Sequence, residues 1–209
     1  MTETLIALLS FLTLHLGGSL GCAILALSLG VRVALMPLTL RLARRALKNQ
    51  EIALTLKPEV DALKKQFEKK PEKLFEEMQK VYRKHNYKPF DLPAVMASFA
   101  QLPIFGIVYN AIKTSVQSGP AFLWIRTLAT PDFLLTFAIL ALTGVSAYYA
   151  PSASEMAKTT LIYIQVVVTF FIVWKLAAGL GLYWAASGSV GLVQNLLLRR
   201  ERLRQRQSI

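Results

Sequence analysis

The chain has 209 residues, of which 54% are hydrophobic and only 17% are charged, with 24 Lys and Arg against 12 Asp and Glu. Soluble domains average about 25% charged residues, and the net charge of +12 lies in blocks between apolar runs, so we expect a membrane protein with no DNA partner. A single cysteine, Cys22, excludes an intrachain disulfide framework and a cysteine-cluster zinc site.

The N-terminal region carries very little charge, since Arg32 is the one charged residue between Glu3 and residue 41. A transmembrane helix needs about 20 apolar residues, so this region is too long for one span. The glycine-rich stretch at residues 17–21 offers a break. We therefore predict an interfacial helix within residues 1–18 and a first transmembrane helix over residues 19–40.

A secretory signal peptide is the competing interpretation of the first 22 residues, because an apolar stretch ends there in small residues. Signal peptides begin with a basic region, and Met1, Thr2 and Glu3 contain no Lys or Arg. We therefore expect this segment to be retained, with Cys22 as a small apolar residue inside the protein.

Residues 41–88 are rich in Lys and Arg, yet their apolar residues recur at helical spacing. Two stripes are formed by Val60, Leu63 and Phe67, and by Leu74, Phe75, Met78, Val81 and Tyr82. They predict a cytoplasmic helical hairpin with a turn at Lys70-Pro71 and a second arm that ends near His85. Pro58 and Pro71 both suit the first turn of a helix, where the missing amide hydrogen costs nothing.

Residues 89–198 contain four further uncharged runs, which are Leu92–Ile112, Phe133–Ser154, Thr159–Trp174 and Leu176–Leu198. Each approaches the length that a membrane-spanning helix requires. They predict transmembrane helices two to five. The fold class is therefore an all-α polytopic membrane protein with five transmembrane helices. A basic cytoplasmic tail follows at residues 199–209.

The distribution of Lys and Arg predicts the orientation of these spans. Of the 24 basic residues, 20 lie in the hairpin, at residue 158 or in the tail, and the opposite loops hold Lys113, Arg126 and Lys175. The N-terminus is therefore expected outside and the C-terminus in the cytoplasm. The tail arginines are candidates to bind a partner, and they are Arg199, Arg200, Arg202, Arg204 and Arg206. The basic surface would also attract anionic lipids.

Arg32 lies inside the first predicted span, about 12 Å from its cytoplasmic end at 1.5 Å per residue. A cation at mid-span costs ~2.5–3.5 kcal/mol on insertion scales. No acidic residue lies within any predicted span, so the sequence offers Arg32 no ion-pair partner inside the membrane. We therefore predict a hydrated cavity, open to the cytoplasm, in which Arg32 attracts an anionic group of a substrate.

Uncharged polar residues within the predicted spans are candidates to line this cavity, and they are Ser28, Ser98, Gln101, Gln165 and Gln194. Ser28 lies one helical turn from Arg32, Ser98 shares a helix face with Gln101, and Ser187 recurs with Gln194 at i, i+7. An ordinary interhelical hydrogen bond, worth ~0.6 kcal/mol, is the competing interpretation for each Ser or Thr.

Catalytic patterns are missing from the sequence. It contains no Ser-His-Asp set, no HExxH, no paired carboxylates and no phosphate-binding glycine loop. Its two histidines, His15 and His85, leave little for acid–base or metal chemistry. We expect no enzymatic activity, no cofactor and no metal.

Six short motifs follow one another along the chain. They are Gly30–Thr39, Leu56–Glu59, Lys88–Phe90, Gln101–Phe105 with Tyr109, Phe122–Ile125 followed by Pro131-Asp132, and Ala178–Trp184 followed by Gln194-Asn195. Together, in this order, they resemble the motifs of the YidC/Oxa-type membrane protein insertases. The resemblance covers nearly the whole chain. We expect a short form of this family, without the large extracytoplasmic domain of many Gram-negative members.

The resemblance implies a bacterial plasma (inner) membrane protein whose five helices enclose a hydrophilic groove, open to the cytoplasm and to lipid and closed outside. In that family a groove arginine takes up polar segments of nascent membrane proteins, whose apolar helices then enter the bilayer without ATP. Arg32 carries this role here, and Gln101 would line the groove beside it. Implied partners are a Sec translocon, the signal-recognition receptor and the ribosome. The chain departs from the family at Arg126-Thr127-Leu128, where an acidic residue is common.

Two other functions fit parts of the sequence. A small transporter or channel would bind an anionic solute at Arg32, but such proteins are commonly built from inverted repeats, and we find none. A scaffold that binds finished membrane proteins is poorly separated from an insertase by sequence alone.

Overall fold

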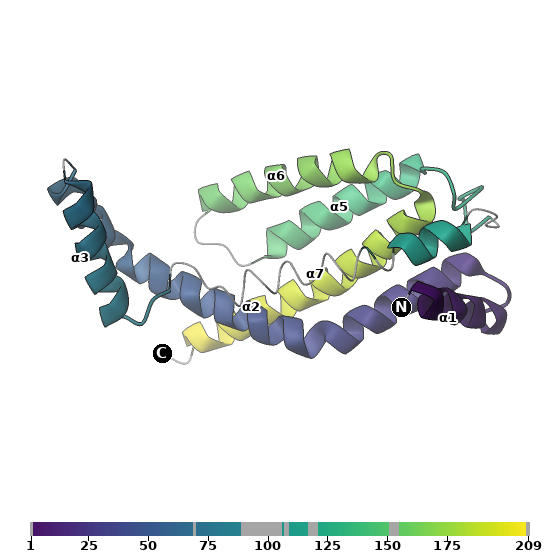
Figure 1. Cartoon of the computed structure of the whole chain (residues 1–209), viewed down its shortest axis with the longest axis horizontal. Helices are drawn as coiled ribbons and strands as arrows, with labels where there is room; N and C mark the ends of the chain where they lie inside the picture. Colours follow the sequence, from purple (N-terminus) through teal and green to yellow (C-terminus); the bar gives the residue numbers. More distant parts are fainter. Residues whose placement is uncertain are drawn as a thin grey trace. The chain divides into compact units, whose positions relative to one another are not determined.

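The computed structural model describes residues 2–68, 70–88, 106, 109–116, 121–150 and 155–207. These residues are mostly helical, and the predicted sites at Ser98 and Gln101 lie outside them. The helices are α1 (Thr2–His15), α2 (Leu20–Gln66), α3 (Pro71–Lys84), α5 (Phe133–Tyr149), α6 (Glu155–Val173) and α7 (Ala178–Gln207) (Figure 1). Residues 109–116 are also helical. The predicted all-α class is confirmed.

The chain divides into two compact units, which we describe separately. The bundle unit comprises Met1–Leu38 and Ala100–Ile209, and the hairpin unit comprises Thr39–Phe99. The first part of α2 belongs to the bundle unit and its remainder to the hairpin unit.

The predicted break in the N-terminal region is confirmed, and glycine explains it. Gly17 and Gly18 have φ angles of 67° and 77°, which side chains with a Cβ disfavour. The Gly18 N–H donates to the Thr13 carbonyl (2.9 Å), closing the C-terminal cap of α1. The next residue, Ser19, caps α2, because its Oγ accepts from the Cys22 N–H (3.3 Å).

The hairpin unit is held by a small apolar core in which Leu56 and Val60 of α2 meet Val81 of α3. Asn49 Nδ2 donates to the Lys88 carbonyl (3.0 Å), which joins the ends of the two arms. Phe75, placed by its spacing in the predicted stripe of α3, is instead 64% exposed. The stripe is therefore narrower than its sequence spacing indicates.

One proline of the hairpin behaves as predicted and the other does not. Pro71 occupies the first turn of α3. Pro58 was expected in a first turn as well, but it lies in the interior of α2, so that prediction is wrong. Proline has a helical φ but removes one backbone hydrogen bond. The buried neighbours Leu56 and Val60 offset this loss by packing on α3.

Within the bundle unit, α5 packs along both α6 and α7 (Figure 1). Small residues allow this approach, because a Cβ on Gly181 would lie 2.8 Å from Leu135 Cδ2 and one on Gly188 would lie 3.1 Å from Leu142 Cδ2. Small residues at such contacts are typical of helices that pack closely within membranes.

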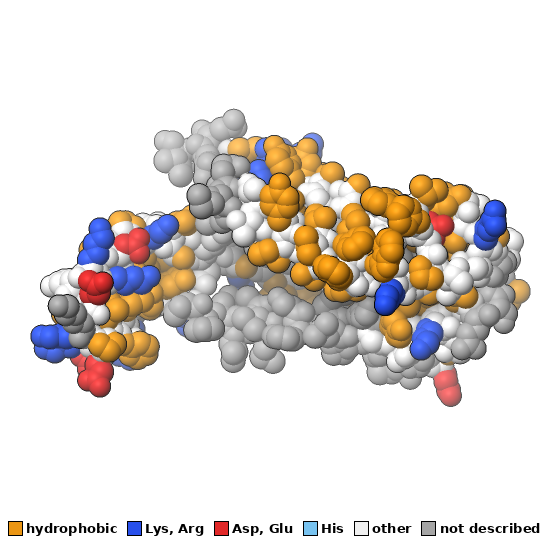
Figure 2. Space-filling model, turned by 90° about the horizontal axis from the view of Figure 1, so that it is seen from above, with side chains coloured by type: hydrophobic (Ala, Val, Ile, Leu, Met, Phe, Trp, Pro, Cys, Tyr) orange, Lys and Arg blue, Asp and Glu red, His pale blue; other side chains and the backbone are white. Residues whose placement is uncertain are grey.

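The surface agrees with a membrane environment. Figure 2 shows hydrophobic side chains gathered over one part of the molecule and charged ones over another. Large exposed apolar residues of α5 and α6 include Phe133, Leu134, Phe137, Tyr163 and Phe171. Among the described helices of 18 residues or more, α2 is the one long and apolar enough to cross a membrane. Shorter apolar stretches lie at Glu3–His15, Phe133–Tyr149 and Lys158–Val173.

Candidate functional site

A cluster of buried apolar side chains fills the end of the bundle unit at which α2, α5 and α7 begin, and we call it the apolar cluster. Its members are Leu9, Leu20, Ala23, Ile24, Leu27, Ala111, Ile112, Val116, Phe122, Ile125, Leu128, Leu135, Ile139, Val173, Ala178, Leu180, Leu182 and Tyr183. Among the described residues, the buried polar side chains are those of Ser28, Thr136, Thr169 and Ser187, and none of them is charged. Burial of these groups is the main term that holds the helix ends together.

Helices α2 and α7 meet inside the apolar cluster through Gly179. A Cβ at this position would lie 2.8 Å from Val116 Cγ2, 3.3 Å from Ile112 Cγ2 and 3.4 Å from Ile24 Cδ1. Only glycine fits such a contact without displacing its neighbours. Over the described residues, close backbone packing follows α5–α7 and α5–α6, and none is found along α2 and α7. The contact of α2 with α7 is thus local.

Polar side chains follow the apolar cluster on both helices, and we call Ser28, Arg32 and Ser187 the polar stretch. Ser28 is 1% exposed, and its Oγ donates back to the Ile24 carbonyl (2.5 Å). Arg32 Nε and Ser187 Oγ are buried, and neither has a hydrogen-bond partner within the part of the chain that the structure describes.

The two unpaired atoms come from residues at matching positions along their helices. Arg32 follows Ile24 by eight residues, and Ser187 follows Gly179 by the same number. At a rise of 1.5 Å per residue, each residue lies about 12 Å beyond the point where α2 and α7 meet. Arg32 and Ser187 therefore lie at about the same depth, and Ser28 lies closer to the contact, about 6 Å beyond it on α2.

The chemistry of the polar stretch favours an anionic or polar ligand. A buried N–H without an acceptor costs ~1–3 kcal/mol, and an incoming oxygen would recover that free energy. Guanidinium groups bind carboxylates and phosphates through paired hydrogen bonds. Arg32 is only half-buried as a whole, so part of its side chain is accessible.

The other predicted lining residues have different surroundings. Gln194, two helical turns beyond Ser187 on α7, is half-buried and has an interaction partner. Gln165 lies on α6 with an exposed side chain. Of the predicted residues in the described part of the chain, Ser28 and Arg32 lie on α2, Gln165 on α6 and Gln194 on α7, the helix that also carries Ser187. Ser187 was noted from its spacing to Gln194 but not predicted as a site residue, since a lone Ser in a span usually makes an ordinary hydrogen bond.

Away from the apolar cluster, α5 and α7 are joined by polar and cation–π contacts. Asn195 Nδ2 donates to the Ser146 carbonyl (3.0 Å) and to its Oγ (3.2 Å). Arg199 lies 5.1 Å from the Tyr149 ring centroid. Among the predicted partner-binding arginines, Arg199 is therefore engaged by α5, and Arg200 and Arg204 are exposed.

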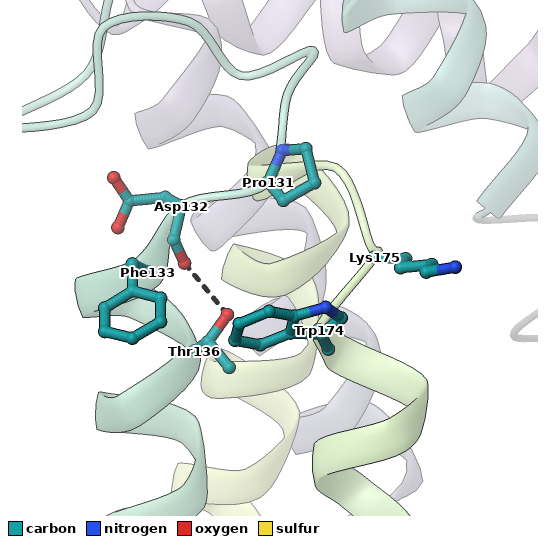
Figure 3. A pocket seen from close by; sticks show the side chains of 6 residues that line it. All are labelled: Pro131, Asp132, Phe133, Thr136, Trp174 and Lys175. Atoms are coloured by element: carbon teal, nitrogen blue, oxygen red, sulfur yellow. Dashed lines mark hydrogen bonds between the residues drawn. The ribbon is translucent and has the colours of Figure 1, made fainter.

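A cavity of about 340 Å³ lies where α5 begins and α6 ends, lined by Pro131, Asp132, Phe133, Thr136, Trp174 and Lys175 (Figure 3). The Thr136 Oγ1 donates to the Asp132 carbonyl (2.9 Å), and Phe133 meets Trp174 edge-on at 5.7 Å. The Lys175 side chain points away from the other five (Figure 3). None of the predicted site residues lines this cavity. No group of His, Cys, Asp and Glu suited to hold a metal is found in the described ranges.

The family model described as 60Kd inner membrane protein matches residues 11–206, which is nearly the whole chain. This chain belongs to the YidC/Oxa-type insertase family. The membrane protein insertase YidC of Clostridium tetani is 29% identical over 194 residues, covering 87% of this chain and 82% of its own length. That of Enterococcus faecalis is 34% identical over 196 residues, covering 88% and 68%.

A crystal structure of an active YidC insertase with its first transmembrane domain resolved matches this chain with a TM-score of 0.66 at 27% identity. The match covers 92% of this chain and 44% of that chain, so this chain spans less than half of the solved protein. The family resemblance derived from the sequence is confirmed, and the family places the chain in a bacterial membrane.

Proposed function

We propose that the chain is a membrane protein insertase that receives nascent membrane proteins in a hydrophilic groove, open to the cytoplasm, and releases their apolar helices into the bilayer without ATP. The observation that carries this proposal is the buried Arg32 Nε without a described acceptor, placed just beyond a dry apolar cluster. Family membership supports it.

The physical basis is a shortened low-dielectric path. A polar segment that crosses pure hydrocarbon loses its hydration along the full thickness, whereas a hydrated polar stretch leaves only the apolar cluster to pass. The positive charge of Arg32 lowers the cost of desolvating an incoming carboxylate. Burial of the substrate's apolar helix, at ~25 cal/mol per Å², supplies the driving free energy.

The proposed topology has five transmembrane helices with the N-terminus outside and the C-terminus in the cytoplasm. The placement of 20 of the 24 basic residues supports it. Gln101, Ser98, Gln165 and Gln194 are proposed to line the groove together with Ser28 and Arg32. The hairpin unit and the exposed tail arginines are proposed to contact anionic lipids, a Sec translocon, the signal-recognition receptor or the ribosome.

Insertion of a single-span substrate with an acidic translocated segment into proteoliposomes tests the proposal. With this protein alone in the bilayer, we expect insertion without ATP, about tenfold less insertion with Arg32→Gln, since hydrogen bonds to charged groups contribute ~1.5–3 kcal/mol, and partial recovery with Arg32→Lys. Arg126→Gln, which removes an exposed arginine, is the matched control and should behave as wild type.

Two results would contradict the proposal. If wild-type vesicles insert no more substrate than empty vesicles do, the chain has no insertase activity under these conditions. If wild type and Arg32→Gln insert equally, the charge of Arg32 has no role in insertion. An anion transporter predicts instead that wild-type vesicles, without any substrate protein, release a trapped anion faster than empty vesicles do.

A further inference from the structure

The loop of residues 121–132, which we call the capping loop, supplies the hydrogen-bond acceptors that the N-terminus of α7 needs. The Ala178 N–H donates to the Thr130 carbonyl (2.9 Å), and the Gly179 N–H donates to the Leu128 carbonyl (3.0 Å). The first N–H groups of a helix have no partner within it. The capping loop thus fixes where α7 begins.

The same loop caps α5 through Asp132. Its Oδ1 accepts from the Leu135 N–H (2.7 Å), which is an N-cap, and also from Trp124 Nε1 (3.1 Å). One carboxylate oxygen therefore joins the start of α5 to the turn at residues 122–125. That turn is closed by two hydrogen bonds between Phe122 and Ile125 (2.9 and 2.8 Å).

The capping loop also reaches α2. A Cβ on Gly21 would fall on the Phe122 ring, so the ring occupies the space that any other residue at position 21 would fill. Phe122, Ile125 and Leu128 are 9%, 2% and 0% exposed, and all three belong to the apolar cluster. One short loop therefore caps two helices and packs against a third.

We propose that the capping loop and the apolar cluster form the permeability barrier of the bundle unit, with Asp132 as the positioning residue that holds the loop across the helix ends. This inference rests on the proposed function, because a groove that is hydrated from one side needs a barrier at its closed end. If the barrier opens, the polar stretch becomes a leak path for small ions across the membrane.

The physical argument concerns the dry length that an ion must cross. The two unpaired polar atoms of the polar stretch belong to residues about 12 Å along α2 and α7 from the Ile24–Gly179 contact, and the described side chains next to Gly179 at that contact are the apolar ones of Ile24, Ile112 and Val116. An unpaired ion in such a medium is strongly disfavoured. Removing the Phe122 ring would leave a void where the capping loop packs against α2 at Gly21, which shortens the packed apolar length that an ion must cross.

Chloride release from proteoliposomes, in the absence of any substrate protein, tests the barrier directly. We expect wild-type vesicles to retain trapped chloride, and Phe122→Ala and Gly21→Ala to release it at least about tenfold faster, which corresponds to ~1.4 kcal/mol off the barrier. Phe171→Ala removes the same side chain from an exposed position, 74% exposed on α6, and should leave release unchanged.

Asp132 is tested with a conservative pair. Asp132→Ala removes both hydrogen bonds to the carboxylate and should raise chloride release, whereas Asp132→Asn keeps an acceptor oxygen for Leu135 N–H and Trp124 Nε1 and should behave as wild type. If the negative charge of Asp132 were what matters, Asp132→Asn would raise chloride release as Asp132→Ala does. The amount of protein in the vesicles and its circular dichroism show whether each variant is folded.

The path of the leak provides an independent readout. A fixed positive charge at Arg32 should make the leak of Phe122→Ala favour chloride over potassium, and adding Arg32→Gln should abolish that preference. A leak without ion preference would overturn the assignment of the polar stretch as the path.

The barrier itself is overturned if folded Phe122→Ala and Gly21→Ala vesicles retain chloride as wild type does, or if Phe171→Ala leaks equally. Failure of wild type to insert substrates would contradict the proposed function but would leave the leak measurements unchanged, so the two proposals fail separately.

Discussion

Both the apolar cluster and the polar stretch include residues of α2 and α7, yet their polar atoms differ in whether they have hydrogen-bond partners. In and around the cluster, backbone N–H groups at the helix starts are satisfied by the capping loop, and the side chains are apolar. One to two turns further along α2 and α7, Arg32 Nε and Ser187 Oγ are buried and have no hydrogen-bond partner among the described residues. Folding thus satisfies the hydrogen-bonding groups near the apolar cluster. In the polar stretch, two groups remain able to bind a ligand.

Helix spacing explains the difference between the two regions. Because Gly21 and Gly179 have no side chain, the Phe122 ring of the capping loop packs against α2 at Gly21, and the Ile24 side chain of α2 packs against α7 at Gly179. Beyond that contact, α2 carries Arg32, a long cationic side chain that cannot be enclosed without a large desolvation cost. Helices α2 and α7 are therefore packed closely at the apolar cluster and carry polar side chains in the stretch that follows it.

The largest effect on insertion is expected from a substitution that places a negative charge in the polar stretch. Ser187→Asp would place a carboxylate at the depth of Arg32 and compete with acidic substrates, so insertion should fall roughly tenfold or more, as expected for loss of a charge-assisted hydrogen bond. Ser187→Asn, which adds no charge, should retain most of the activity. The assay is the proteoliposome insertion described above.

A substitution at the helix contact should affect the apolar cluster rather than the polar stretch. Gly179→Ala places a Cβ 2.8 Å from Val116 Cγ2, and overpacking of this kind costs ~1–3 kcal/mol. Thermal unfolding in detergent should show a lower midpoint. Gly191→Ala, whose Cβ meets nothing within 4 Å, serves as the control. Equal midpoints for both variants would contradict the close contact of α7 with the cluster.

A smaller effect is expected at the other end of α5. Asn195→Ala removes two hydrogen bonds to Ser146, and interhelical hydrogen bonds in membranes average ~0.6 kcal/mol. The unfolding midpoint should fall slightly, with insertion nearly unchanged. Ser189→Ala, which removes a hydroxyl bonded only within its own helix (2.9 Å to the Ala185 carbonyl), should change the midpoint less. A larger loss of insertion than of stability would give this contact a functional role instead.

The smallest effect concerns the hairpin unit, whose buried core contrasts with the unpaired atoms of the polar stretch. Burial raises the pKa of Tyr82 above 10.0, with a further contribution from the neighbouring Tyr87. Folding therefore favours the neutral phenol, and this contribution to stability is present below the unfolded pKa and is lost as pH rises through the folded pKa. Tyr82→Phe should lose less helicity than wild type between about pH 9 and pH 12. An identical pH profile by circular dichroism would contradict this.

The sequence predicted the helical class, the glycine break before α2 and the family, because each depends on local composition or on short motifs. It did not predict that Pro58 lies inside α2, because this depends on the tertiary packing of Leu56 and Val60. It also did not predict that Phe75 is exposed, because this depends on how wide the contact between α2 and α3 is.

The candidate site was predicted in part. Arg32 stands out in the sequence because a charge in an apolar run is costly, and the structure adds that its Nε is buried without a described acceptor. Ser187 could not be singled out, because its lack of a partner depends on how α7 is placed. The capping role of Asp132 likewise depends on the turn at residues 122–125, which brings Trp124 to its carboxylate.

Water access along α2 and α7 tests the central claim most directly. After Cys22→Ala, single cysteines would replace Ser28, Arg32 or Ser187 in the polar stretch, and Ile24 or Leu182 in the apolar cluster. Each variant would be exposed, in oriented membranes, to a membrane-impermeant thiol reagent. We predict labelling at positions 32 and 187 from the cytoplasmic side and protection at 24 and 182, and we expect protection at 28 as well because the Ser28 side chain is 1% exposed. Labelling of the polar stretch from the outer side, or equal protection of all five positions, would contradict a groove that is hydrated from the cytoplasm and closed by the apolar cluster.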